Sequence, residues 1–206
     1  MGFYDSFKKD HLIAAHRGGG KYKENTIAAF LYAKSRCDFI EFDVRECKDE
    51  IVVFHDKDLK RLFNKNALVK DLRYGELKKY FIPSLKEVLD VLEDFPINIE
   101  IKTQKHDKEK FVKRLLGILN GRKNVLISAF NFDYLRLVDY PKAILLENRI
   151  ELPEDFEYEA VHINKEYLKH LKTDKFVGVY TVNEKDEIDR LFKSGVKAVF
   201  TDNLEL

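Results

Sequence analysis

The chain of 206 residues has no tryptophan, two cysteines, four prolines and a net charge of only +1. A general nucleic-acid binder carries a strong excess of Lys and Arg, so this balance of charges argues against that class. No apolar run approaches the ~18 residues that a bilayer-spanning helix needs. The N-terminal segment MGFYDSFKKDHLIAAHRGG lacks the basic and apolar stretches of a secretory signal. We therefore expect no nucleic-acid partner and no stable membrane insertion.

Cysteine is too scarce for a disulfide framework. Cys37 and Cys47 are expected near the two ends of one extended strand. At ~3.3 Å per residue, about 30 Å would then separate them, which is too far for a disulfide. Free thiols favour a reduced, cytoplasmic setting.

The chain is 45% hydrophobic and 35% charged, as expected for a folded protein. A chain of this size buries roughly 70% of its unfolded surface, so it needs neither a disulfide nor a metal to hold a core. The length predicts one domain over residues 1–206. The oligomeric state has no signature in the sequence.

Short apolar runs alternate with amphipathic stretches, a pattern typical of parallel α/β proteins. We expect eight strands, at residues 12–16, 38–44, 97–102, 125–130, 143–147, 160–164, 177–182 and 198–201. We expect helices at residues 25–35, 84–94, 108–119, 133–138, 165–171 and 185–193. Ser84 and Glu87 form a capping box, Asn183 precedes an acidic first turn, and Gly195 ends the last helix.

Eight strands with helices between them predict a compact (β/α)8 TIM barrel, and an open doubly wound sheet is the alternative. The strand count favours the barrel, as do the polar residues that end many strands. In a barrel these strand ends meet at a single mouth. The strand-end residues are His16, Asp43, Lys102, Asn164 and Asp202.

One interval between strands is long. Residues 45–96 hold more than one helix and begin with two extended runs around a turn at residues 48–50. We expect a hairpin there that pairs Val44 with His55, to within a residue or two. This pairing returns His55 to the level of Asp43, at the mouth.

Carboxylates gather on the inner face of two predicted strands. Side chains alternate along a strand, so Glu41 and Asp43 share the interior face while the apolar residues between them face the helices. The same alternation points Glu100 and Lys102 inward. Three hard oxygen ligands predict a divalent cation, Mg²⁺ or Ca²⁺, with Mn²⁺ as a further candidate. The alternative is a buried ion-pair network of these groups with Arg17.

The end of the first strand adds chemistry to this mouth. His16 is followed by Arg17 and three glycines, and such a loop lets the backbone approach a ligand closely. Arg17 can hold a phosphate through two donors. Phosphodiester cleavage needs a cation, a proton acceptor for the nucleophile and a proton donor for the leaving alkoxide. His16, His55 and the carboxylates supply these three functions.

Taken together, the motifs resemble the glycerophosphodiester phosphodiesterase family over nearly the whole chain. In chain order they are His16-Arg17-Gly18, Glu24-Asn25-Thr26 with Ala29-Phe30 and Ala33, Glu41-x-Asp43-Val44, Val53-x-His55-Asp56, Leu59-x-Arg61, Ile82-Pro83-Ser84-Leu85-x-Glu87-Val88-Leu89, Glu100-Ile101-Lys102, Thr181-Val182-Asn183, Gly195-Val196 and Thr201-Asp202.

The resemblance implies a (β/α)8 fold and a small-molecule substrate. The reaction it implies is cleavage of glycerophosphodiesters to sn-glycerol 3-phosphate and an alcohol, with a divalent cation. Carried over by position, it implies His16 and His55 as the acid/base pair, Glu41, Asp43 and Glu100 as metal ligands, and Arg17 and Lys102 as phosphate contacts.

Two further residues belong to the same motifs. Asn25 either caps the first helix or serves the site, and Glu24 is a weaker candidate for a metal-linked role. Lys23 stands where the family commonly has proline, and Tyr180 where it commonly has tryptophan. The segment 56–83, which covers the site in the family, is shorter than usual and predicts a reduced substrate lid.

Aromatic and histidine residues outside the motifs are harder to place. Phe63, Tyr74, Phe81, Phe130 and Tyr180 are candidates for the wall of the mouth, with packing against the core favoured for Tyr74 and Phe81. The remaining histidines match no motif and are expected at the surface or the rim; they are His11, His106, His162 and His170.

Two rival functions remain open. A lysophospholipase D would remove the headgroup of a single-chain lipid, although the chain lacks an amphipathic helix with a basic face for membrane binding. A non-catalytic metal- or phosphate-binding barrel is the other. The presence of both His16 and His55 argues against that barrel.

Overall fold

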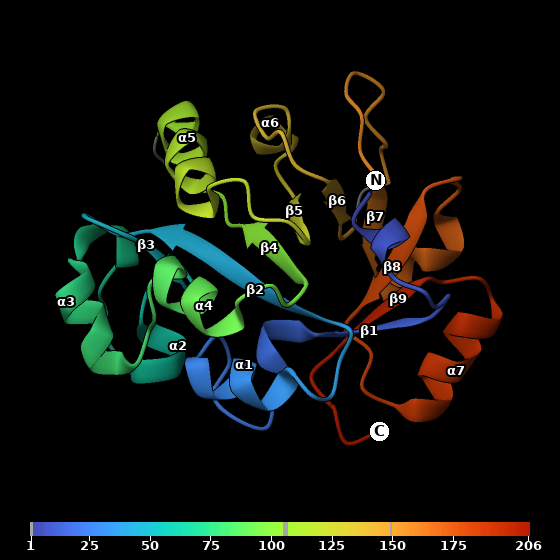
Figure 1. The fold of residues 1–206 in the computed structure, drawn as a ribbon, viewed down its shortest axis with the longest axis horizontal. Helices are drawn as coiled ribbons and strands as arrows, with labels where there is room; N and C mark the ends of the chain where they lie inside the picture. The colour runs from blue at the N-terminus through green and yellow to red at the C-terminus, as the bar shows by residue number, and fades with distance from the viewer. Residues whose placement is uncertain (1, 105–106, 149) are drawn as a thin grey trace.

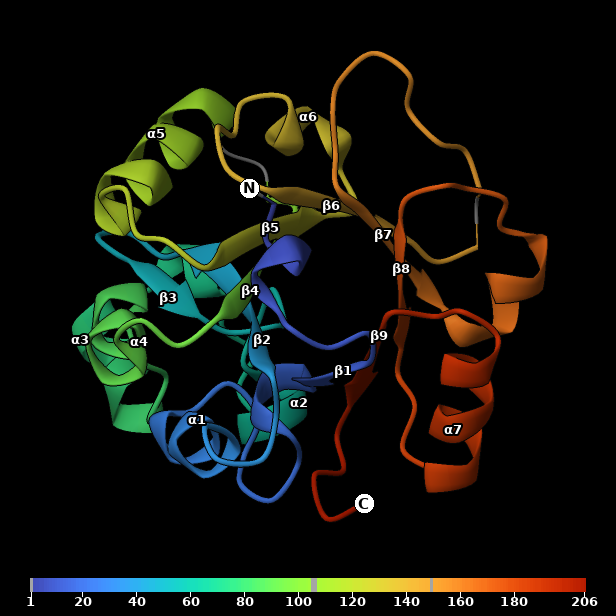
Figure 2. The same cartoon turned by 45° about the vertical axis from the view of Figure 1, so that its right-hand side comes forward.

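The strands of this protein close into a ring. The computed structural model describes residues 2–104, 107–148 and 150–206. Among these residues, nine strands are hydrogen-bonded in the order β1-β9-β8-β7-β6-β5-β4-β2-β3, and a further pairing of β1 with β2 closes the ring. Pairing within the ring is parallel, whereas β3 runs antiparallel to β2 outside it. The fold is a TIM barrel with one extra strand, so the open sheet is wrong (Figure 1, Figure 2).

The ring strands lie where the sequence predicts them. The strands are β1 Leu12–Ala15, β2 Phe39–Glu46, β3 Ile51–Val53, β4 Ile97–Ile101, β5 Val125–Ala129, β6 Lys142–Leu146, β7 Ala160–Asn164, β8 Phe176–Tyr180 and β9 Ala198–Thr201. The α-helices are α1 Ile27–Ala33, α2 Lys60–Phe63, α3 Tyr74–Leu77, α4 Leu85–Leu92, α5 Lys108–Leu119, α6 Phe132–Leu135 and α7 Lys185–Lys193. The 3-10 helices are η1 Tyr4–Ser6, η2 His16–Gly18, η3 Val69–Asp71, η4 Lys78–Tyr80 and η5 Lys165–His170.

Helix boundaries follow local capping chemistry. The capping box of Ser84 and Glu87 is present at the start of α4. Gly195 follows α7 at φ +94°, the left-handed conformation in which glycine ends a helix. The helix predicted at residues 165–171 is instead the 3-10 helix η5. None of the described helices combines the length and the apolar character needed to cross a bilayer.

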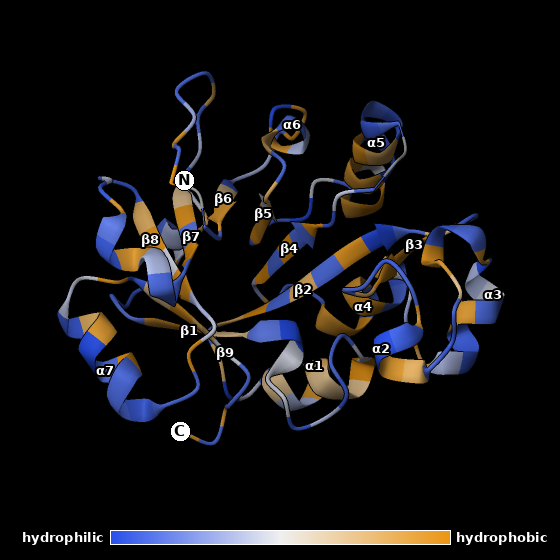
Figure 3. Cartoon of the chain, turned by 180° about the vertical axis from the view of Figure 1, so that it is seen from behind, coloured by the Kyte–Doolittle hydropathy of each residue, from blue (hydrophilic) through white to orange (hydrophobic). Residues whose placement is uncertain are grey.

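Side-chain alternation sorts each ring strand into an outer and an inner face. On β2, Ile40, Phe42 and Val44 pack outward into the main core beneath the helices, and Phe39 packs inward. Figure 3 shows apolar stretches along the strands and mixed polarity on the surrounding helices. Small and large side chains fill the lower part of the barrel, namely Leu12, Ala14, Phe39, Leu126, Ala143, Ala160, Ala198 and Phe200. The carboxylates of β2 therefore lie above a closed apolar floor.

The N-terminal segment seals the lower end of the barrel. Phe3 and Tyr4 are buried and pack edge-on against Phe39. The Glu159 carboxylate accepts hydrogen bonds from the backbone N–H of Phe3 at 2.8 Å and of Tyr4 at 2.5 Å. This plug leaves the opposite end, at the carboxyl ends of the strands, as the open mouth.

The hairpin after β2 forms with a register two residues away from the predicted pairing. Val44 pairs with Val53 rather than with His55. The turn is tight, because the N–H of Cys47 donates to the carbonyl of Glu50 at 2.8 Å. The predicted consequence still holds, since the N–H of Phe54 donates to the carbonyl of Asp43 at 2.9 Å and places His55 beside it.

The segment between this hairpin and α4 builds a small core of its own. Its buried residues, together with two from the hairpin, form a cluster separate from the barrel cores, and α3 lies beside β3 at the edge of the molecule (Figure 1). They are Cys47, Val52, Phe54, Leu59, Val69, Leu77 and Ile82. Phe81 is 81% exposed, so the prediction that it packs in the core is wrong. Tyr74 is half-buried against this cluster, as predicted.

Candidate active site

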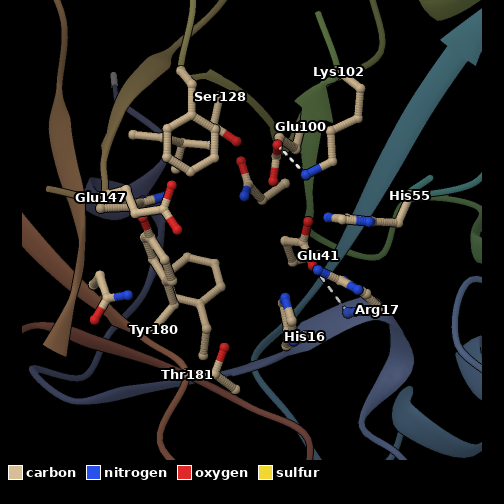
Figure 4. Close-up of a pocket in the computed structure, with 16 residues that line it drawn as sticks. His16, Arg17, Glu41, His55, Glu100, Lys102, Ser128, Glu147, Tyr180 and Thr181 are labelled. Atoms are coloured by element: carbon tan, nitrogen blue, oxygen red, sulfur yellow. Dashed lines mark hydrogen bonds and ion pairs between the residues drawn. The ribbon is translucent and has the colours of Figure 1, made fainter. Parts of the chain in front are cut away.

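The mouth of the barrel encloses a cavity of about 410 Å³ (Figure 4). The structure brings the predicted site residues together there. Lining the cavity are His16, Arg17, Glu41, His55, Glu100 and Lys102. Asp43 lies behind them and is fully buried.

Three carboxylates form the centre of the site. Glu41 and Asp43 come from β2, and Glu100 lies directly across from Asp43 on the neighbouring strand β4. One oxygen of each lies within 4.8 Å of the others, and all three side chains are buried. The inward alternation predicted for these strands therefore produces one compact acidic cluster.

Asn25 holds the most buried of these carboxylates. Its Nδ2 donates to Oδ2 of Asp43 at 2.7 Å, and its Oδ1 accepts from the Asp43 backbone N–H at 3.3 Å. The helix cap of α1 is Thr26, whose side chain accepts from the N–H of Ala29. Of the two roles open for Asn25, capping is therefore wrong, and Asn25 serves the acidic cluster.

Two cations lie against the cluster. The Lys102 Nζ is 3.0 Å from Oδ1 of Asp43 and also contacts Glu100. The Arg17 Nε is 3.4 Å from Oδ2 of Asp43, and its backbone N–H donates to Glu41 at 2.9 Å. The ion-pair network weighed as an alternative is therefore present around the same carboxylates.

Burial and mutual repulsion shift the acidity of the cluster. Burial, together with the charge of Asp43, raises the pKa of Glu41 to about 7 and that of Glu100 to about 8. Burial acts on Asp43 in the same direction, but the charges of Lys102 and Arg17 outweigh it and hold the pKa of Asp43 below its ordinary value. Without a further cation, the cluster retains protons near neutral pH.

The cluster fits a hard divalent cation. Oε1 of Glu41 is buried and has no hydrogen-bond partner among the described residues. A carboxylate oxygen left in this state is costly unless a proton or a metal occupies it. Three carboxylates with open positions are the donor set that Mg²⁺ and Ca²⁺ prefer.

His16 is held by a carboxylate from the last strand. Its Nδ1 lies 2.8 Å from Oδ1 of Asp202, which follows β9. Asn183 fixes this segment by accepting from the Asp202 backbone N–H at 2.8 Å, so it does not cap α7 as its position suggested. Burial opposes protonation of His16, but the hydrogen bond to Asp202 and the charge of Glu41 outweigh burial and raise its pKa.

His55 is held in the same way on the other side of the mouth. Its Nδ1 lies 2.7 Å from Oδ1 of Asp56. Arg61 forms ion pairs with both Asp56 and Glu24: its Nε lies 2.6 Å from Asp56, and its Nη2 lies 2.5 Å from Glu24. Glu24 also forms an ion pair with Arg17. Burial lowers the pKa of His55, and the charge of Asp43 opposes this only in part. Glu24 thus orients other site residues, beside the cluster rather than in it.

Sequence reasoning missed most of the opposite wall of the cavity. Phe130 and Tyr180 line it as expected, whereas Phe63 packs against Phe54 and Tyr80 instead. The sequence predicts Asn164 only as a strand-end residue. The lining residues that it does not predict include Ser128, Leu145, Glu147, Thr181 and Phe200. Glu147 carried a usable signal, because it follows a strand as directly as the other strand-end residues do.

His162 corrects another expectation. It is fully buried inside the barrel, not at the surface or the rim, and its Nε2 is 2.7 Å from the Tyr4 hydroxyl of the N-terminal plug. Burial lowers its pKa to about 3, so it is neutral. His11 and His170 are exposed as predicted, and His106 lies outside the described residues.

Comparisons with known proteins agree with this site. A model of the glycerophosphoryl diester phosphodiesterase family matches residues 16–179. A glycerophosphodiester phosphodiesterase of Bacillus altitudinis is 32% identical over 229 residues, covering 92% of this chain and 94% of the relative. A human lysophospholipase D is 39% identical over 136 residues, covering 55% of this chain and 43% of the relative.

Among solved structures, the glycerophosphodiester phosphodiesterase of Thermotoga maritima superposes with a TM-score of 0.79 at 28% identity, covering 97% of both chains. The family match begins at His16 and includes the whole acidic cluster with its two cations. The chain therefore belongs to the glycerophosphoryl diester phosphodiesterase family.

Proposed function

We propose that the protein is a metal-dependent phosphodiesterase that hydrolyses glycerophosphodiesters to sn-glycerol 3-phosphate and an alcohol. The observation that carries the proposal is the convergence at one mouth of a buried three-carboxylate cluster, two cations and two carboxylate-held histidines. Membership of the family supports the substrate class.

In this proposal Glu41, Asp43 and Glu100 hold the divalent cation, which is Mg²⁺, Ca²⁺ or Mn²⁺. A cation bound there offsets the negative charge that develops on the phosphoryl oxygens. Arg17 and Lys102 bind the phosphate, because both present fixed donors at the cavity wall beside the cluster.

The two histidines take opposite proton-transfer roles. The raised pKa of His16 favours its protonated form, so it donates a proton to the departing alkoxide. The lowered pKa of His55 keeps it neutral, so it accepts a proton from the nucleophile, either water or a neighbouring hydroxyl of the substrate. Paired groups whose pKa values are pushed apart are the usual arrangement for acid and base partners.

The test is turnover of glycerophosphocholine and glycerophosphoethanolamine with each of the three cations. Release of sn-glycerol 3-phosphate, suppressed by a chelator and by His16→Ala, is the expected result. A His170→Ala variant serves as the control, because His170 is exposed and outside the cavity. Activity that survives both the chelator and His16→Ala would overturn the proposal.

A lysophospholipase D activity is the second candidate, supported by the human relative that bears this name. The residues at the mouth would act in the same way in both cases, so the rates on lysophospholipids and on their deacylated diesters decide between the two activities.

A cytoplasmic location and a single domain over residues 1–206 stay predictions. The free thiols of Cys37 and Cys47 support the cytoplasmic location.

A further inference from the structure

The cavity at the barrel mouth has two unlike halves. The near half comes from β1, β2, β4 and the hairpin, and it carries the acidic cluster with its cations and histidines. The far half comes from β5 to β8 and is largely neutral, because burial keeps His162 uncharged. Glu147 is the one formally charged side chain among the described residues that line this far half.

The Glu147 carboxylate is turned into the cavity. The residue directly follows β6, and Figure 4 shows its carboxylate facing the catalytic side chains across the open space. It also borders an adjoining groove that contains Arg136.

Glu147 has no counter-ion in the part of the chain that the structure describes. Among the described residues it makes no hydrogen bond and no ion pair. Arg136 is already paired with Asp155 at 2.7 Å, and Lys165 is paired with Glu187 at 3.0 Å. This exposed carboxylate at the cavity wall is therefore available to a cationic group of a ligand.

Two aromatic rings stand beside this carboxylate. The Tyr180 hydroxyl donates to the Leu146 carbonyl at 2.7 Å, which fixes the ring beside Glu147 and leaves the hydroxyl proton engaged with the carbonyl. Phe130 meets the Tyr180 ring edge-to-face, with centroids 6.4 Å apart. Aromatic faces combined with a carboxylate are the surroundings that bind an alkylammonium group.

The aromatic wall also adjoins the proposed phosphate position. The Lys102 Nζ lies 6.0 Å from the centroid of the Phe130 ring. A substituent on a phosphate held by Lys102 therefore lies next to Phe130, and Glu147 lines the same cavity.

We propose that Glu147, with Phe130 and Tyr180, forms a subsite for a cationic alcohol group, so that diesters of amino alcohols are the preferred substrates. The inference rests on the proposed phosphodiesterase function and names the leaving alcohol within it. Neutral alcohols such as glycerol leave the Glu147 charge uncompensated and bind less well.

The experiment compares glycerophosphocholine and glycerophosphoethanolamine with the neutral diester glycerophosphoglycerol. Glu147→Gln keeps the shape of the side chain and removes its charge. For the two cationic diesters we expect kcat/KM to fall about fivefold, through KM, as for a partly exposed ion pair beside an aromatic ring. Turnover of glycerophosphoglycerol should not fall, because the variant removes a charge that this neutral diester does not use, and the retained turnover also shows that the variant is folded.

Glu154→Gln is the matched control, because it removes an exposed carboxylate from the same connecting segment outside the cavity. Tetramethylammonium gives a second readout with glycerophosphoglycerol as the reporter substrate. We expect it to inhibit the wild type competitively and Glu147→Gln more weakly.

An equal loss on all three diesters would overturn the inference, because Glu147 would then serve the shared glycerophosphate part. Unchanged kinetics on all three would overturn it as well. In both cases the proposed function would stand. If the wild type cleaved none of the diesters, the proposed function itself would fail, and the inference with it.

Discussion

The two halves of the barrel mouth handle charge in different ways. In the near half, Asp43 is bound at once by Asn25, Arg17 and Lys102, and both histidines are tied to carboxylates. In the far half, the lining is neutral apart from Glu147, which no described residue pairs. The near half is a preorganised network in which one change disturbs several groups, as suits proton transfer and charge stabilisation. The charged and polar side chains of the far half share few contacts, so a substitution there should affect one contact with the substrate at a time. Such an arrangement suits substrate selection.

Removal of a near-half histidine should have the largest effect. We expect His55→Ala to lower kcat about 10²- to 10⁴-fold, because the nucleophile loses its proton acceptor. The measurement is steady-state kinetics on glycerophosphoethanolamine at saturating metal. His11→Ala, at an exposed histidine, is the control. Wild-type kcat in His55→Ala would mean that the network does not carry the chemistry.

His162, under the far half, should affect stability rather than catalysis. Burial lowers its folded-state pKa to about 3, whereas unfolded histidine titrates near its ordinary value. The folded state therefore binds fewer protons than the unfolded state between these values, and stability falls as pH drops. From pH 7.5 to 4.5 we expect the wild type to lose about 2.6 kcal/mol relative to His162→Gln.

Urea unfolding of both proteins at pH 7.5 and 4.5 measures this difference. The control is kcat at pH 7.5, which His162→Gln should leave near the wild-type value. Parallel losses of stability in the two proteins would show that His162 is not held neutral by the fold.

Asn25 tests whether the near half holds its metal ligands in place. We expect Asn25→Ala to weaken metal binding about 10- to 100-fold, as loss of a group that orients a metal ligand generally does. Calorimetric titration with Mn²⁺ measures it. Thr26→Ala is the matched control, because loss of this helix cap costs about 1 kcal/mol of stability without touching the carboxylates. Equal metal affinity in wild type and Asn25→Ala would show that Asn25 does not orient a metal ligand.

The carboxylates behind the histidines should move the two limbs of the pH–rate profile separately. Asp202 raises the pKa of His16, so Asp202→Asn should lower that pKa and shift the alkaline limb to lower pH. Asp56 acts on His55 in the same direction, so Asp56→Asn should shift the acidic limb to lower pH. Shifts of about one pH unit are expected for loss of one charged partner. Movement of the same limb in both variants would contradict the assigned roles.

Phe81, outside both halves, should give the smallest effect. Its backbone is left-handed, at φ +61°, and its ring is exposed. The backbone is therefore strained, and the ring buries little apolar surface that could offset this cost. We expect Phe81→Gly to raise the free energy of unfolding by about 0.5 kcal/mol and to leave kcat unchanged. Urea denaturation measures it, with Leu31→Ala as an exposed control in a regular helix. Destabilisation by Phe81→Gly would show that the ring makes contacts that stabilise the fold.

The near half was also the more predictable half. Alternation along β2 and β4 put Glu41, Asp43 and Glu100 on one face, and the structure gathers them within 4.8 Å. The hairpin register lies two residues from the central prediction, at the edge of the stated range, because the turn between Cys47 and Glu50 is tight.

The far half depends on contacts between distant parts of the chain. His162 is covered by Tyr4, which is 158 residues away in the sequence and forms a hydrogen bond with it. No local sequence pattern predicts a contact over this separation. In the near half, too, Asn183 matches a helix start, but its side-chain oxygen accepts hydrogen bonds from Thr201 at the end of β9 and from Asp202 after it. Glu147 follows its strand as Lys102 does, yet no motif marked it.

The most direct test of the central claim is metal rescue at the acidic cluster. Wild-type protein and Glu41→Gln are stripped with a chelator, and release of sn-glycerol 3-phosphate from glycerophosphoethanolamine is followed as Mg²⁺, Mn²⁺ or Ca²⁺ is returned. We predict that the stripped wild type is inactive and regains turnover with a divalent cation, whereas Glu41→Gln does not. Turnover by the stripped wild type, or equal rescue of the two proteins, would contradict a catalytic cation at Glu41, Asp43 and Glu100.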